Sequence, residues 1–262
     1  MVWNRTPAKA AALVELGARQ AATVHDAVGA AQLVIVSVKG NATARDLLEG
    51  ARDVPAGRAV LNLTDGTSAE ARDMAAWAAE RDAAYLHGQI MTIAPGVGHP
   101  DAVVFYGGSK DVHDEFRGVL DLLGGRGSLV SDDAGVPALY GMAVHDTMWG
   151  TLNGLLHAAA LLESAGIEAE RFLTDARPSI TALLGFLPGI AHEVDRREHA
   201  VEYGALKHHL PSVDDLVRES RARGIDEEFP ACTLSLVSRA VEQGHGGDSY
   251  SRLIEHFRGG SG

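Results

Sequence analysis

The longest helical pattern in the chain lies between Ala138 and Gly166, and it constrains how the rest can fold. The stretch reads ALYGMAVHDTMWGTLNGLLHAAALLESAG, has no proline after Pro137 and ends on a glycine, a common helix terminator. At about 1.5 Å rise per residue, the helix is about 40 Å long, which exceeds one small domain. Its apolar and small side chains cover more than one stripe, so we expect burial on most sides. We predict a helix that connects two domains.

Four polar side chains interrupt this apolar pattern: His145, Asp146, Asn153 and His157. Polar groups on a largely buried helix need hydrogen-bond partners, and a ligand can supply them as well as a neighbouring helix. Two interpretations are therefore open. Either the polar groups bond to adjacent helices, or this helix carries the chemistry of the protein.

Composition narrows the class of protein. The 262 residues suffice for two domains, and 46% hydrophobic with 22% charged residues is typical of a globular chain. A net charge of -12 without a basic run argues against nucleic acid as a partner. The single Cys232 excludes an intrachain disulfide and favours a cytoplasmic location. No apolar run reaches the roughly 18 residues of a membrane span, so we expect no membrane partner.

The first half alternates short apolar strands with helices of about ten residues, which predicts a parallel, doubly wound α/β sheet. Residues 1–3 look like the end of a strand, and Asp65 or Thr67 can cap a helix that runs to about residue 81. We expect an α/β domain over residues 1–135, an interdomain helix over 136–166 and an all-α domain over 167–262. The strands are expected near residues 33–38, 59–64, 85–91, 103–106 and 127–130.

The second half reads as helices joined by short connections. We expect breaks at Pro178 and Pro188, a polar connection over residues 199–209, and a helix capped by Ser212. His199, His208 and His209 lack the helical spacing and supporting carboxylate of a zinc site, so we predict no metal.

The carboxyl ends of parallel strands form the ligand-binding edge of such a sheet. Residues 4–6, 37–41 and 64–67 are expected along this edge. Arginine binds phosphate through a bidentate fork and lysine adds a point charge, so the first segment predicts a phosphate site, although it could be only a polar turn. No acidic residue stands there to bond a ribose 2'-hydroxyl, which favours NADP over NAD. The phosphate-binding candidates are Asn4, Arg5, Thr6 and Lys9.

One expected element is missing from the sequence as given. A dinucleotide-binding fold opens with a strand, a glycine-rich GxGxxG turn and a helix, and none precedes Val2. The PGVGHP segment at residues 95–100 does not replace it, because the spacing differs and a proline follows. Loss of that strand from its usual central position would leave two sheet edges unpaired.

The order of motifs resembles the NADPH-dependent imine reductases within the wider beta-hydroxyacid dehydrogenase superfamily. The resemblance covers essentially the whole chain and lacks only the opening strand and glycine-rich turn. The motifs are VWNRTPAKAAALVELGA, LVIVSV, LNLTDGTSAEA, HGQIMTIAPGVGHPDAVVFYGG, MWGTLNGLLHAAALLESAG, VRESRARGIDEEFP and VSRAVEQGHGGDSYSRLIEHF.

The resemblance implies a Rossmann-like domain, a long interdomain helix and a C-terminal domain of the 6-phosphogluconate dehydrogenase type. It also implies an interlocked homodimer, in which each active site lies between the cofactor domain of one subunit and the helices of the other. NADPH is the implied cofactor. The expected cofactor contacts are Asn4, Arg5, Thr6, Lys9, Val38, Lys39 and Thr64.

The resemblance also bears on the reaction. Hydroxyacid dehydrogenases of the superfamily use a lysine on the long helix, and residues 138–166 contain none. Imine reductases carry an aspartate or tyrosine there instead, so we expect Asp146, with Tyr140 as the alternative, to protonate the nitrogen or hold an iminium by charge. Hydride from NADPH would then reduce the C=N bond of an apolar cyclic imine. The expected substrate contacts are Trp149, Met148, Gln89, Met91, Thr92 and His209.

Two alternative functions stay open at this stage. A carbonyl or 3-hydroxyacid dehydrogenase would use a different proton donor on the same scaffold. A dimerising remnant without catalysis would follow if the missing glycine-rich turn abolished cofactor binding.

Overall fold

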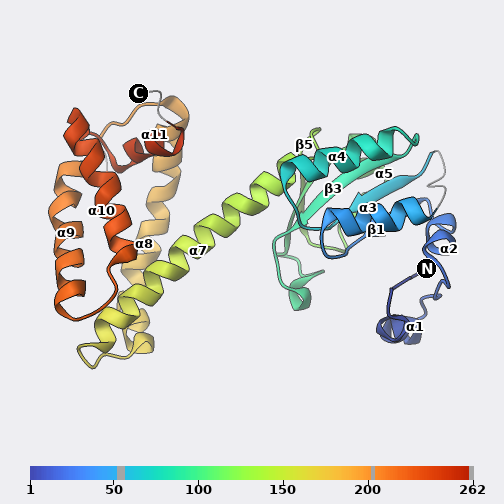
Figure 1. Cartoon of the computed structure of the whole chain (residues 1–262), viewed down its shortest axis with the longest axis horizontal. Helices are drawn as coiled ribbons and strands as arrows, with labels where there is room; N and C mark the ends of the chain where they lie inside the picture. Colours follow the sequence, from blue (N-terminus) through green and yellow to red (C-terminus); the bar gives the residue numbers. More distant parts are fainter. Residues whose placement is uncertain (52–56, 202–203, 260–262) are drawn as a thin grey trace. The chain divides into compact units, whose positions relative to one another are not determined.

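We analysed a computed structural model of the chain, which describes residues 1–51, 57–201 and 204–259 (Figure 1). The chain forms two compact units, Met1–Thr147 and Met148–Gly262. The division falls inside α7 (Val136–Glu163), the predicted long helix. The limits of the three predicted domains stay a prediction.

The first unit is built on a five-stranded mixed sheet in the order β1-β2-β3-β4-β5. β1, β2 and β3 are parallel, whereas β4 is antiparallel to β3 and β5 is parallel to β4. The prediction of an all-parallel sheet is therefore wrong at β4. Residues 91–102 hold only the three-residue helix Ala94–Gly96, so no crossover helix returns the chain to the same edge. The strands are β1 (Leu33–Val36), β2 (Ala59–Asn62), β3 (Ala84–Ile90), β4 (Val103–Gly108) and β5 (Arg126–Ser131).

The opening residues do not extend the sheet. Val2 forms an isolated parallel bridge with Gln20, and its carbonyl oxygen accepts from the backbone N–H of Ala21. The predicted opening strand is wrong, because Val2 pairs locally and not with a sheet strand. The helices that follow are the 3₁₀ helix Pro7–Ala10, α1 (Ala11–Glu15) and α2 (Val24–Gly29).

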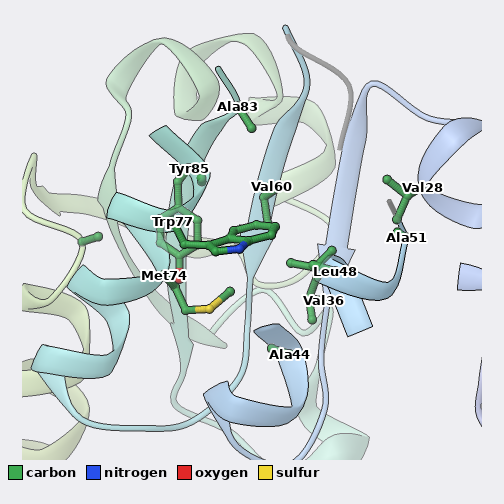
Figure 2. Close-up of a cluster of buried hydrophobic side chains, with 12 residues drawn as sticks. Val28, Val36, Ala44, Leu48, Ala51, Val60, Met74, Trp77, Ala83 and Tyr85 are labelled. Atoms are coloured by element: carbon green, nitrogen blue, oxygen red, sulfur yellow. The ribbon is translucent and has the colours of Figure 1, made fainter. Parts of the chain in front are cut away.

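Helices cover both faces of the sheet. On one face α3 (Asn41–Gly50) and α4 (Ser68–Ala79) pack around Trp77, as Figure 2 shows. On the other face α5 (Lys110–Glu115) and α6 (Arg117–Leu120) cover a second apolar cluster that includes Tyr106 of β4. Neighbouring residues of β2 alternate between the two clusters, and all of β2 is buried.

α4 begins where the sequence predicts a helix. Thr67 is the N-cap, and Thr67 and Glu70 form a capping box in which each side chain accepts from the other's backbone N–H. Of the two predicted capping residues, Thr67 takes this position. Asp65 therefore does not serve the helix.

The second unit is a helical bundle, and two helix limits differ from the prediction. α8 continues through Pro178 and Pro188, because the other turns of its 28 residues keep their hydrogen bonds. α9 begins at Leu206, so Ser212 lies inside the helix and is not its cap, and His208 and His209 belong to its first turn. The helices are α8 (Ala169–Arg196), α9 (Leu206–Ala222), α10 (Glu228–Ala240) and α11 (Ile254–Phe257).

The core of this bundle forms where α9, α10 and the 3₁₀ helix Tyr250–Leu253 meet, around Leu206 and Val237. The end of α8 is attached by a buried polar contact, in which the Ser251 hydroxyl donates to Glu193 Oε2 at 2.5 Å. Among the residues that the structure describes, no helix is both long enough and apolar enough to cross a membrane.

α7 is not buried on most sides, contrary to the expectation. Only Pro137, Ala138 and Gly141 are buried within the chain, whereas Trp149 and Leu156 are 57% and 66% exposed. The apolar pattern of this helix is therefore not explained by packing within one chain.

Three polar residues of β3 alternate onto the face that α3 and α4 cover: Tyr85, His87 and Gln89. The Tyr85 hydroxyl accepts from Asn62 Nδ2 at 3.0 Å and lies 3.4 Å from His87 Nδ1. His87 is fully buried, and burial lowers its pKa from 6.5 to about 4. His87 is therefore neutral in the folded protein near neutral pH.

We expect His87 to make the unfolding free energy pH-dependent. Between pH 6.5 and about 4, the unfolded chain binds a proton at His87 that the folded chain does not. The unfolding free energy therefore falls as the pH drops, by about 2 kcal/mol between about pH 6.5 and pH 5. Urea denaturation of the wild type and of His87→Gln over this range measures the effect. The two curves should diverge toward acid, and parallel curves would contradict the assignment.

Candidate cofactor and substrate site

The carboxyl ends of β1 and β2 are joined by the segments that follow them. The backbone N–H of Val38, after β1, donates to Thr64 Oγ1 at 3.3 Å. The N–H of Thr64 in turn donates to Asn62 Oδ1 at 3.1 Å. Val38, Lys39 and Thr64, three of the predicted cofactor residues, therefore lie on one edge of the sheet.

Asn62 also connects this edge to α3 and β3. Its Nδ2 donates to Asn41 Oδ1 at 2.8 Å and to the Tyr85 hydroxyl, so each polar atom of this buried side chain has a partner. Asn41 is the first residue of α3. At Gly66 a Cβ would lie 2.2 Å from Asn41 Nδ2 and 2.8 Å from Glu70 Oε2, so a larger residue would displace these side chains. The turn after β2 thus packs directly on the start of α3.

The donors on this edge suit an anionic ligand. The N-cap of α3 is Gly40, with φ of 84° and no side-chain capping bond, so the backbone N–H groups of the first turn have no side-chain acceptor at that cap. Lys39 beside it is exposed. Arg5 and Lys9 are also exposed, and within residues 1–51, 57–201 and 204–259 none of these three cations forms an ion pair. This donor set fits the phosphates of a nucleotide.

The first predicted phosphate segment, residues 4–6, differs from the prediction in its position. Residues 4–6 follow the Val2 bridge and not a sheet strand, so their expected place at a strand end of the sheet is wrong. Asn4 Oδ1 accepts from the backbone N–H of Thr6 at 2.9 Å, which holds the turn before the helix at Pro7. A role for Asn4, Arg5, Thr6 and Lys9 in cofactor binding stays a prediction.

Gln89, predicted to contact substrate, is 6% exposed, and its amide has a protein partner. Gln89 Nε2 donates to Asp65 Oδ1 at 2.8 Å. Its aliphatic part lies against α7, where a Cβ on Gly141 would come within 2.6 Å of Gln89 Cγ. Gln89 therefore links the turn after β2 to the long helix.

The other predicted residues of the first unit surround the end of β3. Met91 and Thr92 are half-buried, and Thr92 Oγ1 lies where a Cβ on Gly96 would be. Tyr140 of α7 packs on Phe105, with ring centroids 4.9 Å apart. These contacts leave Tyr140 44% exposed.

Asp146 is exposed and lies five residues after Gly141. At about 100° per residue, the two positions are about 140° apart around α7, so Asp146 is not on the face that packs on Gln89. Met148 and Trp149 follow in the second unit, where His209 also lies, with its ring 5.3 Å from that of Tyr250. The roles predicted for these residues stay predictions.

Sequence reasoning missed the pairs Asn41–Asn62 and Asp65–Gln89. The signal was present as polar residues after β2 and in the middle of β3, where an apolar run is expected. Across the described ranges, no three His, Cys, Asp or Glu side chains are grouped as metal ligands would be.

Comparison with known proteins matches both halves of the chain. Residues 1–131 match the NAD binding domain of 6-phosphogluconate dehydrogenase, and residues 133–259 match the NADPH-dependent reductive aminase-like C-terminal domain. The NADPH-dependent reductive aminase of Aspergillus oryzae is 34% identical over 263 residues, which covers 99% of this chain and 89% of that protein.

Solved structures agree along the whole chain. The imine reductase of Aspergillus terreus in complex with NADPH4 and dibenz[c,e]azepine is 38% identical with a TM-score of 0.92, and the match covers 98% of this chain and 89% of that one. The imine reductase of Myxococcus stipitatus in complex with NADP+ is 30% identical with a TM-score of 0.90, over 97% and 90% of the two chains. The chain therefore belongs to the imine reductase and reductive aminase family of NADPH-dependent oxidoreductases.

Proposed function

We propose that this chain reduces the C=N bond of imines and iminium ions to amines with NADPH. The observation that carries the proposal is the likeness of 98 to 99% of this chain to a reductive aminase and an imine reductase. Relatives from Aspergillus terreus have been solved with dibenz[c,e]azepine and with cyclohexanone and allyl amine. Apolar cyclic imines, preformed or made from a ketone and an amine, are the substrates we propose here.

Each part of the site has a proposed task. NADPH, when bound, supplies the hydride. Lys39, Thr64 and the backbone around Val38 hold the cofactor at the strand ends, and the segment from Asn4 to Lys9 supplies phosphate contacts. Met91, Thr92, Met148, Trp149 and His209 are proposed to contact the substrate, and such contacts exclude water and orient the C=N bond.

The first test is a comparison of substrates and cofactors on the full chain. With NADPH, a panel of cyclic imines should be reduced, and a panel of ketones without amine should not. NADH should serve poorly, because no acidic residue follows Val2 to bond a ribose 2'-hydroxyl whereas Arg5 is available for a phosphate. Arg5→Ala should raise KM for NADPH about tenfold and leave KM for NADH nearly unchanged. Preferred reduction of ketones would instead support a carbonyl reductase.

Asp146 is the proposed carboxylate of α7 that acts on the substrate nitrogen. Asp146→Ala should lower kcat on a cyclic imine about tenfold or more, because a charged partner of the nitrogen is lost. Steady-state kinetics and melting temperature measure the effect and check folding. Unchanged turnover in a folded variant would remove Asp146 from the mechanism.

We propose a homodimer in which a second copy covers the apolar surface of α7 and α8. An exposed apolar surface of this extent is typical of an interface, and the family resemblance supplies the occupant. A cytoplasmic location stays a prediction from composition. The exposed apolar side chains are Leu139, Met142, Val144, Met148, Trp149, Leu152 and Leu156 on α7, and Leu173, Ile180, Leu183, Leu184, Phe186 and Leu187 on α8.

Sedimentation velocity tests the dimer. The wild type should sediment as a dimer at micromolar concentration, and the double substitution Leu183→Arg, Leu187→Arg should shift it toward monomer, because two charges would be buried unpaired. Leu122→Arg is the matched control, since Leu122 is 73% exposed on the first unit and outside the proposed interface. A wild-type monomer, or equal behaviour of both variants, would contradict the proposal.

A further inference from the structure

Asp65 is exposed near the carboxyl end of β2, and a hydrogen bond from one side chain holds its carboxylate. Its Oδ1 accepts from Gln89 Nε2 at 2.8 Å. Thr67 caps α4, so Asp65 is not needed at that helix terminus. In the part of the chain that the structure describes, Asp65 takes part in no ion pair. Its charge is therefore available to a ligand.

Gln89 is held so that it can orient this carboxylate. It is 6% exposed on β3 and lies beneath Gly141 of α7, where even a Cβ would come within 2.6 Å of its side chain. A side chain confined in this way has few rotamers to exchange. Its amide therefore fixes one carboxylate oxygen of Asp65, a residue that is itself exposed.

His87 on β3 and Glu70 on α4 supply no positive charge to Asp65. On β3, burial lowers the pKa of His87 to about 4, and the charge of Asp65 only partly opposes that effect. On α4, Glu70 is itself an anion and accepts from both the backbone N–H and the hydroxyl of Thr67. Among the described residues Asp65 thus has no ion-pair partner, on an edge where ligands bind.

We infer that the Asp65 carboxylate, positioned by Gln89, contacts the cationic nitrogen of the bound iminium substrate. The inference rests on the proposed function and assigns it a further catalytic residue. An imine nitrogen takes its proton from water, and the Asp65 carboxylate accepts a hydrogen bond from the resulting N–H. This ion pair raises the pKa of the bound imine and so enlarges the fraction that can accept hydride.

The geometry separates this role from that of Asp146. The face of α7 at Gly141 packs on Gln89, and Asp146 is about 140° away around the helix. Asp65 is therefore the carboxylate on the strand-end side of α7. Gln89 acts through Asp65 and is a positioning residue.

The test compares two substrates that differ only in their need for a proton, a cyclic imine and its N-methylated iminium cation. Asp65→Asn keeps an acceptor for Gln89 but removes the charge. We expect kcat/KM for the imine to fall about tenfold or more. For the permanent cation, KM should rise while kcat stays nearly unchanged, because no protonation is needed. Asp46 is an exposed residue of α3. Asp46→Asn makes the same change of charge and should behave as wild type for both substrates.

Gln89→Leu tests positioning. It should lower kcat/KM for the imine in the wild-type background and add little in the Asp65→Asn background, because the two residues act as a unit. Calorimetric titration of the NADP+-bound protein with a protonated cyclic amine adds a readout without turnover. Its affinity should fall in Asp65→Asn and not in Asp46→Asn.

The outcomes distinguish the two proposals. If the wild type reduces no imine with NADPH, the proposed function fails. If the wild type is active but Asp65→Asn matches Asp46→Asn on both substrates and in calorimetry, the assignment of Asp65 is overturned. Melting temperatures identify misfolding, and Asp65→Ser, which keeps an acceptor on a shorter side chain, then replaces the failed variant in the same comparison.

Discussion

The first unit depends on one buried side chain, Asn62 at the end of β2. Its amide donates to Asn41 at the start of α3 and to Tyr85 on β3, and its oxygen accepts from the backbone of Thr64. A buried amide is costly unless every polar atom is paired, and here the partners come from three separate elements. The strand ends that carry the predicted cofactor residues Val38, Lys39 and Thr64 are therefore held in one arrangement by the protein's own hydrogen bonds.

The long helix α7 is apolar but largely exposed in the single chain. An apolar helix is normally surrounded by its own chain, yet only its first turns are buried here, around Pro137, Ala138 and Gly141. Those turns pack on the sheet unit, where Gly141 admits the side chain of Gln89. Beyond these turns, several large apolar side chains of α7 stay exposed in the single chain. The same helix thus supports the candidate site at its start and exposes large apolar side chains farther along.

The sequence predicted what short-range patterns determine and missed what distant contacts determine. The strand from Leu33, the capping position of Thr67 and the long helix follow from periodicity and capping, so they were found. The antiparallel β4 depends on a connection whose helix is too short to cross over, and the continuity of α8 through Pro178 depends on its other turns. Of the site, the strand-end positions were predictable, but Gln89 and Asp65 are 24 residues apart, so their polar character was visible in the sequence and their pairing was not.

The strand-end edge carries both a cationic side chain and a carboxylate, which suits a reaction between an anionic cofactor and a cationic substrate. Lys39, which is exposed on this edge, has no ion-pair partner in the described chain, and neither does Asp65. If these charges served stability alone, opposite signs would pair with each other, as Arg72 and Asp133 do. Keeping them unpaired costs little in solvent, and it leaves each sign available to a ligand of the opposite charge.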